Sequence, residues 1–323
     1  MNNIMTIQKS VTILIPCFNE QESINLLFTD LASVCSTLPI IQWNLLFVND
    51  GSTDQTLPLL KSLIDRDHSW CHLTVINLTR NFGKEAALIA GLDYVTSDAC
   101  IVMDADLQHP PSAIPEMLRL WSQGAEVVSA KRELVSKSNS LKRLISVAFY
   151  RIFRATSKLE ITLDSSDFRL LDKAVVLAIR QCRESVRFSK GFFAWVGFSN
   201  AVFFYNQPER LFGTAKWGSW KLWNYALDGI FNFSTAPLRI WTYIGIVVTL
   251  ISFSLGISVV LSALLYGIDL PGYTSIFVTM TFLGGIQLIG IGVLGEYIGR
   301  TYIESKSRPL YLIRNIYSHE INQ

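Results

Sequence analysis

Apolar runs alternate with helical patterns through the first 130 residues of the chain. The apolar runs are four to eight residues long, as in strands buried on both faces of a parallel sheet. They lie at residues 11–18, 45–48, 73–77, 99–104 and 126–130. Helical periodicity fills the intervals at 21–36, 55–65, 84–95 and 112–122. This order predicts a doubly wound α/β domain with a mostly parallel sheet, in which ligands bind at the carboxyl ends of the strands.

The pattern changes towards the end of the chain, where charge almost disappears. Residues 240–268 and 274–295 contain no charged side chain, and each stretch exceeds the roughly 20 residues that cross a bilayer. The loop between them has one acid and no Lys or Arg, whereas Arg239 and Arg300 begin basic flanks on either side. We therefore predict a hairpin of two transmembrane helices, about 240–266 and 274–298, with both ends in the cytoplasm.

The segment before the first span repeats Trp217, Trp220 and Leu227 at helical spacing. This spacing is typical of an amphipathic helix lying in the membrane interface; the alternative is a core helix of the preceding domain. The predicted divisions are a cytoplasmic α/β domain at 1–215, a juxtamembrane helix at 216–239, the two spans within 240–299, and a basic cytoplasmic tail at 300–323.

Composition narrows the classes of function. The chain has 323 residues, a formal net charge of +2 and 17% charged residues, less than the roughly 25% typical of soluble domains. A nucleic-acid-binding domain would show a clustered basic excess, so no nucleic-acid partner is expected. The five cysteines form no C-x-x-C pair, and the first apolar run is short for a signal peptide. These features favour a cytoplasmic domain without disulfides or zinc.

Polar residues follow four of the predicted strands, at 16–20, 49–54, 79–85 and 104–108. Taken singly, each loop is also explained as a turn or helix cap; together they predict one polar site. Neither G-x-G-x-x-G nor G-x-x-x-x-G-K-[ST] occurs, which removes the main dinucleotide and P-loop alternatives. Asp104 and Asp106, with Gln108 beyond, offer hard oxygen ligands for Mg²⁺ or Mn²⁺, and such a metal would bridge a diphosphate.

The ordered set of loops resembles glycosyltransferase family 2, whose members have the GT-A fold. Further stretches at 130–132, 167–170, 209–216 and 283–301 are similar to the polyprenyl-phosphate glycosyltransferases. That branch includes the bactoprenol glucosyltransferases of O-antigen modification and, more distantly, dolichol-phosphate mannose synthase. The resemblance covers residues 11–312. It implies a GT-A-type sheet followed by the interfacial helix and the hairpin, with a nucleotide-sugar donor, a polyprenyl phosphate acceptor and a divalent cation.

The resemblance also implies roles for individual residues. The expected donor-binding residues are Pro16, Phe18, Glu20, Asp50, Asp104, Arg210 and Lys216. The expected metal ligands are Asp106 and Gln108, with Asp104. The expected acceptor-phosphate ligands are Arg132, Arg143 and Arg169. Asp167 matches the position proposed as catalytic base, and Asp104 and Asp106 complete the catalytic set.

Several of these residues have alternative explanations. Arg132 could lie in a solvated turn, Arg143 could rest against anionic headgroups, and Asp167 could cap the helix that begins near Lys173 or pair with Arg169. Lys84 joins the donor-binding set because a cation at the start of a helix is unfavourable, which suggests a nearby phosphate. A phosphate monoester has a second pKa near ~6 and is mostly a dianion at neutral pH. We therefore predict that Asp167 contributes more to orientation than to proton removal.

The predicted reaction is inverting transfer of a hexose, with UDP-glucose as the expected donor, to undecaprenyl phosphate. It would occur at the cytoplasmic face of the bacterial inner membrane and give a lipid-linked monosaccharide for O-antigen or another surface glycan. UDP-N-acetylhexosamine and GDP-mannose stay open as donors, and membrane-embedded relatives suggest a homotetramer. The rival enzyme is a processive polysaccharide synthase, for which two spans are few. The rival from another class is a non-catalytic membrane scaffold or lipid-translocating partner.

Overall fold

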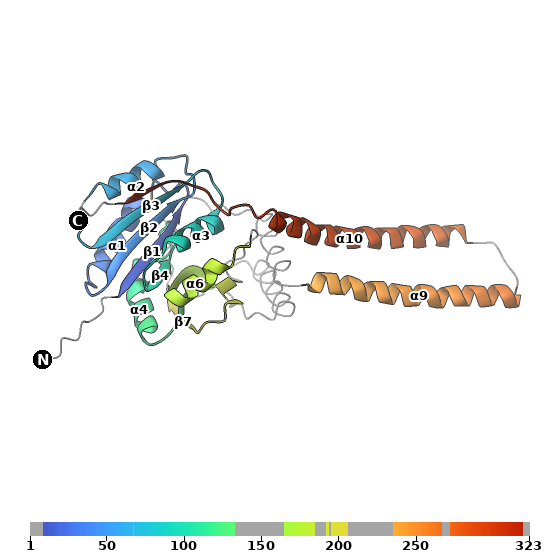
Figure 1. Ribbon diagram of the computed structural model, residues 1–323. Coiled ribbons are helices and arrows are strands. Elements are labelled where there is room, and N and C mark those ends of the chain that lie inside the picture. Colours follow the sequence, from blue (N-terminus) through green and yellow to red (C-terminus); the bar gives the residue numbers. More distant parts are fainter. Residues whose placement is uncertain are drawn as a thin grey trace.

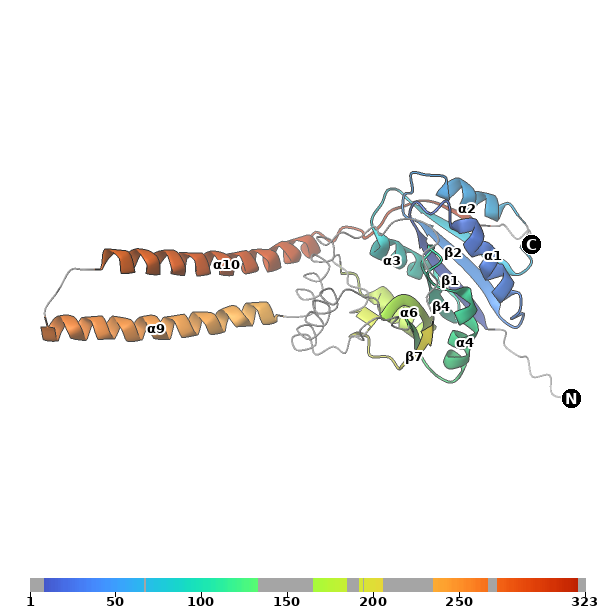
Figure 2. The same cartoon turned by 180° about the vertical axis from the view of Figure 1, so that it is seen from behind.

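The computed structural model describes residues 9–66, 68–132, 165–184, 192–193, 195–205, 235–266 and 272–318. Within these ranges, helices cover both faces of one eight-stranded sheet, and two further long helices extend away from it side by side (Figures 1 and 2).

The sheet is mixed but mostly parallel. Its strands are β1 (Ser10–Cys17), β2 (Gln42–Asn49), β3 (Cys71–Leu78), β4 (Ala99–Val102), β5 (Val127–Arg132), β6 (Ser165–Asp172), β7 (Asn200–Tyr205) and β8 (Ile313–Ser318). They lie in the order β7-β5-β6-β4-β1-β2-β3-β8, and β6 and β8 run antiparallel to their neighbours. The five strands expected from the apolar runs are confirmed, with ends shifted by a few residues. The sequence pattern did not predict β6, β7 or β8.

Helices pack on the two faces of the sheet in separate sets. They are α1 (Ile24–Cys35), α2 (Thr56–Ile64), α3 (Lys84–Tyr94), α4 (Ile114–Ser122) and α6 (Lys173–Gln181), with a short 3-10 helix, η1 (Pro111–Ala113), before α4. α1, α2 and α4 bury their apolar residues on one face, and α3 and α6 on the other. Along β1, Ile13 and Ile15 face the first set while Leu14 faces the second. The doubly wound prediction is therefore confirmed for this part of the chain.

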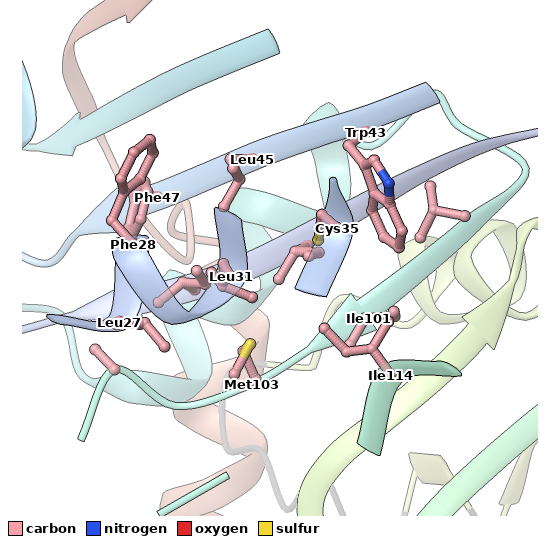
Figure 3. Close-up of a cluster of buried hydrophobic side chains, with 14 of the residues drawn as sticks. Leu27, Phe28, Leu31, Cys35, Trp43, Leu45, Phe47, Ile101, Met103 and Ile114 are labelled. Carbon is pink, nitrogen blue, oxygen red and sulfur yellow. The ribbon is translucent and has the colours of Figure 1, made fainter. Parts of the chain in front are cut away.

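The larger core lies between α1 and the central strands. Leu31 and Cys35 of α1 point at Trp43 and Phe47 of β2, and Met103 lies across from them (Figure 3). Each fully buried large apolar side chain stabilises the folded state by about 1.5–3 kcal/mol relative to an exposed one. Helices cover both faces of the central strands, so side chains on both faces of these strands are buried and apolar residues are favoured at consecutive positions.

The opposite face packs even more closely against β1. A Cβ atom at Gly91 of α3 would lie 2.1 Å from a Cδ atom of Leu14. Real Cβ contacts are essentially never this short, so a larger residue at position 91 would require the Leu14 side chain to shift.

The start of α6 corrects one explanation of Asp167. The residue that caps this helix is Asp172, whose carboxylate accepts a hydrogen bond from the Ala174 N–H at 2.9 Å. Asp167 lies five residues earlier, inside β6, so the capping alternative for Asp167 is wrong.

The two long helices are α9 (Ala236–Tyr266) and α10 (Tyr273–Ser305). They expose large apolar side chains such as Phe253, Leu264 and Leu288. By length and hydropathy, one segment of the described residues qualifies as a membrane span, Phe282–Ser305; Ile240–Leu255 is a shorter apolar helix. The predicted pair of helices is thus present, whereas its crossing of a membrane as two spans stays a prediction.

The chain after α10 does more than form a tail. α10 continues to Ser305, past the predicted end of the span at 298, and Glu296 pairs with Arg300 across one helical turn at 2.7 Å. Residues beyond it return to the sheet, where β8 pairs with β3. The Tyr311 hydroxyl donates to the Asp93 carboxylate at 2.7 Å, and Arg183 pairs with the same carboxylate. The predicted basic tail at 300–323 therefore contains the end of a helix and an edge strand.

Candidate active site

The loops after β1 and β2 are joined to each other by hydrogen bonds. Asn19 has a left-handed backbone (φ 54°), and its side-chain oxygen accepts from the Thr53 N–H at 2.9 Å. In return, the Asn19 N–H donates to the Ser52 hydroxyl at 3.0 Å, and the Glu20 N–H donates to the Thr56 hydroxyl at 2.8 Å. These bonds give two of the predicted donor-binding loops one fixed arrangement.

Three predicted donor residues lie along the first of these loops. Pro16 is in β1 opposite Val48, and Phe18 follows the strand, half-buried. The Glu20 carboxylate accepts from the Ser23 hydroxyl at 3.1 Å. The structure therefore brings Pro16, Phe18 and Glu20 to the carboxyl edge of the sheet, as the alternation of strands and helices predicts.

Asp50 is buried and holds the loop after β3. Its two carboxylate oxygens accept from the Phe82 N–H at 2.7 Å and the Gly83 N–H at 2.9 Å. Burial raises the pKa of Asp50, and the two N–H donors act in the opposite direction. Asp50 therefore fixes the turn that leads into Lys84.

The centre of the site is a cation held between two carboxylates. The Lys84 ammonium lies 2.7 Å from Asp104 Oδ1 and 2.6 Å from Asp167 Oδ2. Burial favours the neutral amine, but Asp104 and Asp167 outweigh it and raise the pKa of Lys84 above its usual range. The partners of Lys84 in the structure are the two acids, and its predicted contact with donor phosphate stays a prediction.

Antiparallel pairing explains why these two acids meet. Val102 of β4 lies opposite Arg169 of β6. Two residues further on, past the end of β4, the same register places Asp104 opposite Asp167. Residues two apart on a strand share a face, so Asp104 and Asp167 lie on the α3 side of the sheet, where Lys84 begins the helix.

The turn after Asp104 carries the other predicted metal ligands. The Gln108 N–H donates to Asp106 Oδ1 at 3.2 Å, and Leu107 between them has a left-handed backbone (φ 61°). A left-handed conformation is costly for leucine, so the turn is held in this shape by its surroundings.

The turn after β4 carries the hard oxygens that a magnesium or manganese site requires. Asp104, Asp106 and Gln108 supply carboxylate and amide oxygens, and the ammonium already marks a point where a cation is accepted. Among the described residues, no three His, Cys, Asp or Glu side chains form a metal-binding group by themselves. The donor set fits a divalent cation that takes further oxygens from its substrate.

Arg169 is an expected ligand of the acceptor phosphate, and the structure places its side chain inside the protein. It is buried, and its guanidinium lies 4.2 Å from the centre of the Phe193 ring. Arg169 nevertheless shares a strand face with Asp167. The other predicted phosphate-binding side chains, those of Arg132, Arg143, Arg210 and Lys216, lie outside the part of the chain whose side chains are described.

One residue of the site was not expected from the sequence. The Asp104 N–H donates to His109 Nδ1 at 3.0 Å, and the imidazole is buried and stacked on Phe168. Burial lowers the pKa of His109. In the sequence, His109 stands out only because it directly follows Gln108. That position does not distinguish a site residue from a core residue.

Comparison with known proteins identifies the family of this chain. Residues 12–179 match glycosyl transferase family 2. The chain is 44% identical over 316 residues to an uncharacterised glycosyltransferase of Synechocystis sp., covering 98% of both proteins. It is 44% identical over 305 residues to the bactoprenol glucosyl transferase of Shigella phage SfV, covering 94% of this chain and 98% of that protein. A prophage bactoprenol glucosyl transferase homologue of Escherichia coli is 43% identical over 306 residues.

Similarity to solved structures is weaker. Glucosyl-3-phosphoglycerate synthase from Mycobacterium tuberculosis is 16% identical, with a TM-score of 0.47 over 69% of this chain and 78% of that one. A likeness of this size carries no conclusion about substrate or metal.

Proposed function

Because the chain belongs to glycosyltransferase family 2 and is a glycosyltransferase, we propose that it transfers glucose from UDP-glucose to a polyprenyl phosphate. The acceptor class is supported by relatives named bactoprenol glucosyl transferase, which align over nearly the whole chain. The donor, the inversion at the anomeric carbon and the cytoplasmic face belong to the proposal.

The observation that carries the proposal is the convergence of Asp104 and Asp167 on one ammonium. Two acids from different strands point at a single cation, at the carboxyl edge of a doubly wound sheet. Transfer between two anionic substrates needs charges held in place before the reactants arrive, because fixed charges stabilise the transition state without reorganising.

We assign the donor to the loops after β1 and β2. Pro16, Phe18 and Glu20 would contact the base and ribose, with Asp50 holding the neighbouring loop in shape. Arg210 and Lys216 would close on the diphosphate. Asp106, Gln108 and Asp104 would hold a divalent cation, which supplies charge neutralisation to the departing nucleoside diphosphate.

Asp167 then acts on the acceptor mainly by position. The Asp167 carboxylate is held 2.6 Å from the Lys84 ammonium, and this contact fixes its position. The acceptor phosphate is mostly a dianion and needs little deprotonation. As substrates bind, the Lys84 ammonium would release Asp104 and Asp167 or share them with the substrates. Arg132, Arg143 and Arg169 would receive the lipid phosphate.

The long helices would bring this site to its lipid. α10 contains the qualifying span, and the apolar surface of α9 suits a second one. With basic residues flanking the pair and an acidic connecting loop, both ends of the hairpin would face the cytoplasm. We propose a multi-pass protein of the bacterial inner membrane that assembles as a homotetramer.

The test is a donor screen with purified full-length protein in vesicles containing undecaprenyl phosphate. Radiolabelled UDP-glucose, UDP-N-acetylglucosamine and GDP-mannose are supplied separately, with and without EDTA, and the lipid extract is analysed. We expect one lipid-linked glucose, lost with EDTA and restored by Mg²⁺ or Mn²⁺. Asp106→Ala should give no metal-dependent product. A polymer, or labelling from GDP-mannose alone, would refute the proposed reaction or donor.

A further inference from the structure

The imidazole of His109 lies beneath the acid-bearing turn, on the face of the sheet opposite to Lys84. Phe168 and Tyr205, which surround it, belong to the core that α1 and α4 cover, whereas α3 covers the other face. The ring is 1% exposed, so His109 contacts the site from inside the protein and cannot touch the substrates directly.

Its hydrogen bond is made where sheet pairing stops. The last cross-strand pair between β4 and β6 is Val102 with Arg169, and the Met103 N–H still donates to Leu14 of β1. At the next residue, the Asp104 N–H donates instead to His109 Nδ1 at 3.0 Å. A nitrogen that accepts this bond carries no proton, which places the proton of the neutral ring on Nε2.

The same ring contacts the strand that carries the second acid. His109 stacks on Phe168 with ring centres 5.0 Å apart and planes 9° apart. Tyr205 closes the group, meeting the Phe168 ring edge-on at 6.0 Å. Phe168 is the residue between Asp167 and Arg169, so one imidazole contacts the backbone at Asp104 and the side chain next to Asp167.

We propose that His109 is a positioning residue for sugar transfer. By accepting the Asp104 N–H and packing on Phe168, it sets the relative positions of the Asp104 and Asp167 carboxylates, which approach the reactants from the other face. The inference rests on the proposed function, and it adds a residue to the site that contacts neither substrate nor metal.

The test compares His109→Asn with His109→Leu. Asparagine and leucine have nearly the same shape, but only asparagine carries an oxygen that can accept the Asp104 N–H. Leucine suits the apolar surroundings better, so a purely structural role predicts that the leucine variant is the more stable and the more active of the two. The matched control is His72→Leu, at the amino end of β3 and far from the acids.

We expect the leucine variant to lose about 10²-fold in kcat, as misplacement of reacting groups by about 1 Å does. The asparagine variant should keep most of the wild-type kcat, although its melting temperature is the same or lower. The donor KM should change little in both, because the base and ribose are held by other loops. Equal kcat values for the two variants, or a higher value for leucine, would overturn the proposal.

A second measurement works even without turnover. In hydrogen–deuterium exchange of the full-length protein, the peptide containing Asp104 should exchange faster in His109→Leu and at the wild-type rate in His109→Asn. If wild-type protein transfers no sugar, the proposed function fails while this readout still decides the role of His109. Faster exchange in both variants, or in neither, contradicts the positioning role.

Discussion

Aspartates at the two edges of the sheet are used in opposite ways. At the amino edge, Asp98 accepts from the Ser10 N–H at 2.9 Å and from the Ser10 hydroxyl at 3.0 Å. At the carboxyl edge, Asp104 and Asp167 converge on Lys84. The first acid is satisfied by donors that cannot leave, since they belong to the strand itself. Asp104 and Asp167 are paired with the flexible side chain of Lys84. An incoming substrate or metal can therefore replace the ammonium as the partner of these carboxylates.

The two edges of the sheet also differ in where left-handed backbone occurs. Among described residues other than glycine, left-handed backbone occurs at Asn19, Leu107 and Ser307. Asn19 and Leu107 lie in loops at the carboxyl edge, and Ser307 follows α10. A left-handed backbone costs about 1–2 kcal/mol for a residue such as leucine, so part of the carboxyl edge is held in an unfavourable conformation at Leu107.

The largest effect should come from Asp167→Asn at the carboxyl edge. We expect kcat to fall about 10²–10³-fold, the range typical of losing one fixed polar group that positions or stabilises the reacting charges. The free energy of unfolding should change by less than about 1 kcal/mol, because the substitution is nearly isosteric. Initial rates over a pH series, together with chemical unfolding, check both parts.

The pH series also decides how Asp167 acts. An orienting carboxylate leaves a residual activity with the wild-type pH dependence. A profile that loses only its basic limb would instead identify Asp167 as a general base.

Lys84→Met should have the next largest effect. Without the ammonium, two carboxylates face each other, and kcat should fall about 10²-fold as a fixed charge is lost. Mn²⁺ should bind about tenfold more tightly in the absence of donor, because a competing cation is gone. Electron paramagnetic resonance titration of free Mn²⁺ measures this. Lys61→Met, whose ammonium lies over the Tyr317 ring away from the site, is the control; equal Mn²⁺ affinity in both variants contradicts the assignment.

Gly51→Ala should destabilise the protein by about 2 kcal/mol through the loop after β2. Gly51 has φ +64°, and its added Cβ would lie 2.4 Å from the Arg80 carbonyl carbon. Gly124→Ala is the matched comparison, since φ is +100° there but no atom lies within 4 Å of the new Cβ. Chemical unfolding should show the larger loss for Gly51. Equal losses would mean that backbone conformation alone, without the close approach, determines the cost.

The smallest effect is expected for Asp98→Asn, which should cost about 1 kcal/mol of stability and leave kcat unchanged. The Ser10 N–H lowers the pKa of Asp98 from its ordinary value, and the Ser10 hydroxyl and nearby lysines act in the same direction. A lowered carboxyl pKa stabilises the fold above the unfolded value, and this stabilisation is lost as pH falls through the folded value. The difference from wild type should therefore disappear in acid. A loss of activity at neutral pH would contradict the contrast between the two edges.

Sequence patterning predicted the parallel half of the fold because that half is local. Each apolar run, such as residues 45–48, is followed by a turn and a helix, so the parallel direction of the strands and their shared carboxyl edge follow from chain order. The order of the strands in the sheet, with β1 between β4 and β2, was not predicted. β6 was missed because its sequence, Ser-Ser-Asp-Phe-Arg-Leu-Leu-Asp, mixes polar and apolar residues. Its position depends on antiparallel pairing with strands far away in the sequence.

The same distinction limits prediction of the site. The placement of Asp50 and Asp104 at one edge followed from the βα loops. The double ion pair of Lys84 did not, since it requires β6 to bring Asp167 opposite Asp104. The bond from Asp104 to His109 is formed by a turn geometry that residue types alone do not specify.

Because β8 lies near the end of the sequence, the sheet is completed only late in synthesis. β3 is complete at Leu78, but the strand that covers its edge begins at Ile313, after both long helices have left the ribosome. Until then, the β3 edge has unpaired backbone groups, and open edges of this kind promote aggregation. If the helices enter a bilayer as they emerge, the domain can finish folding only on a chain that has already been inserted.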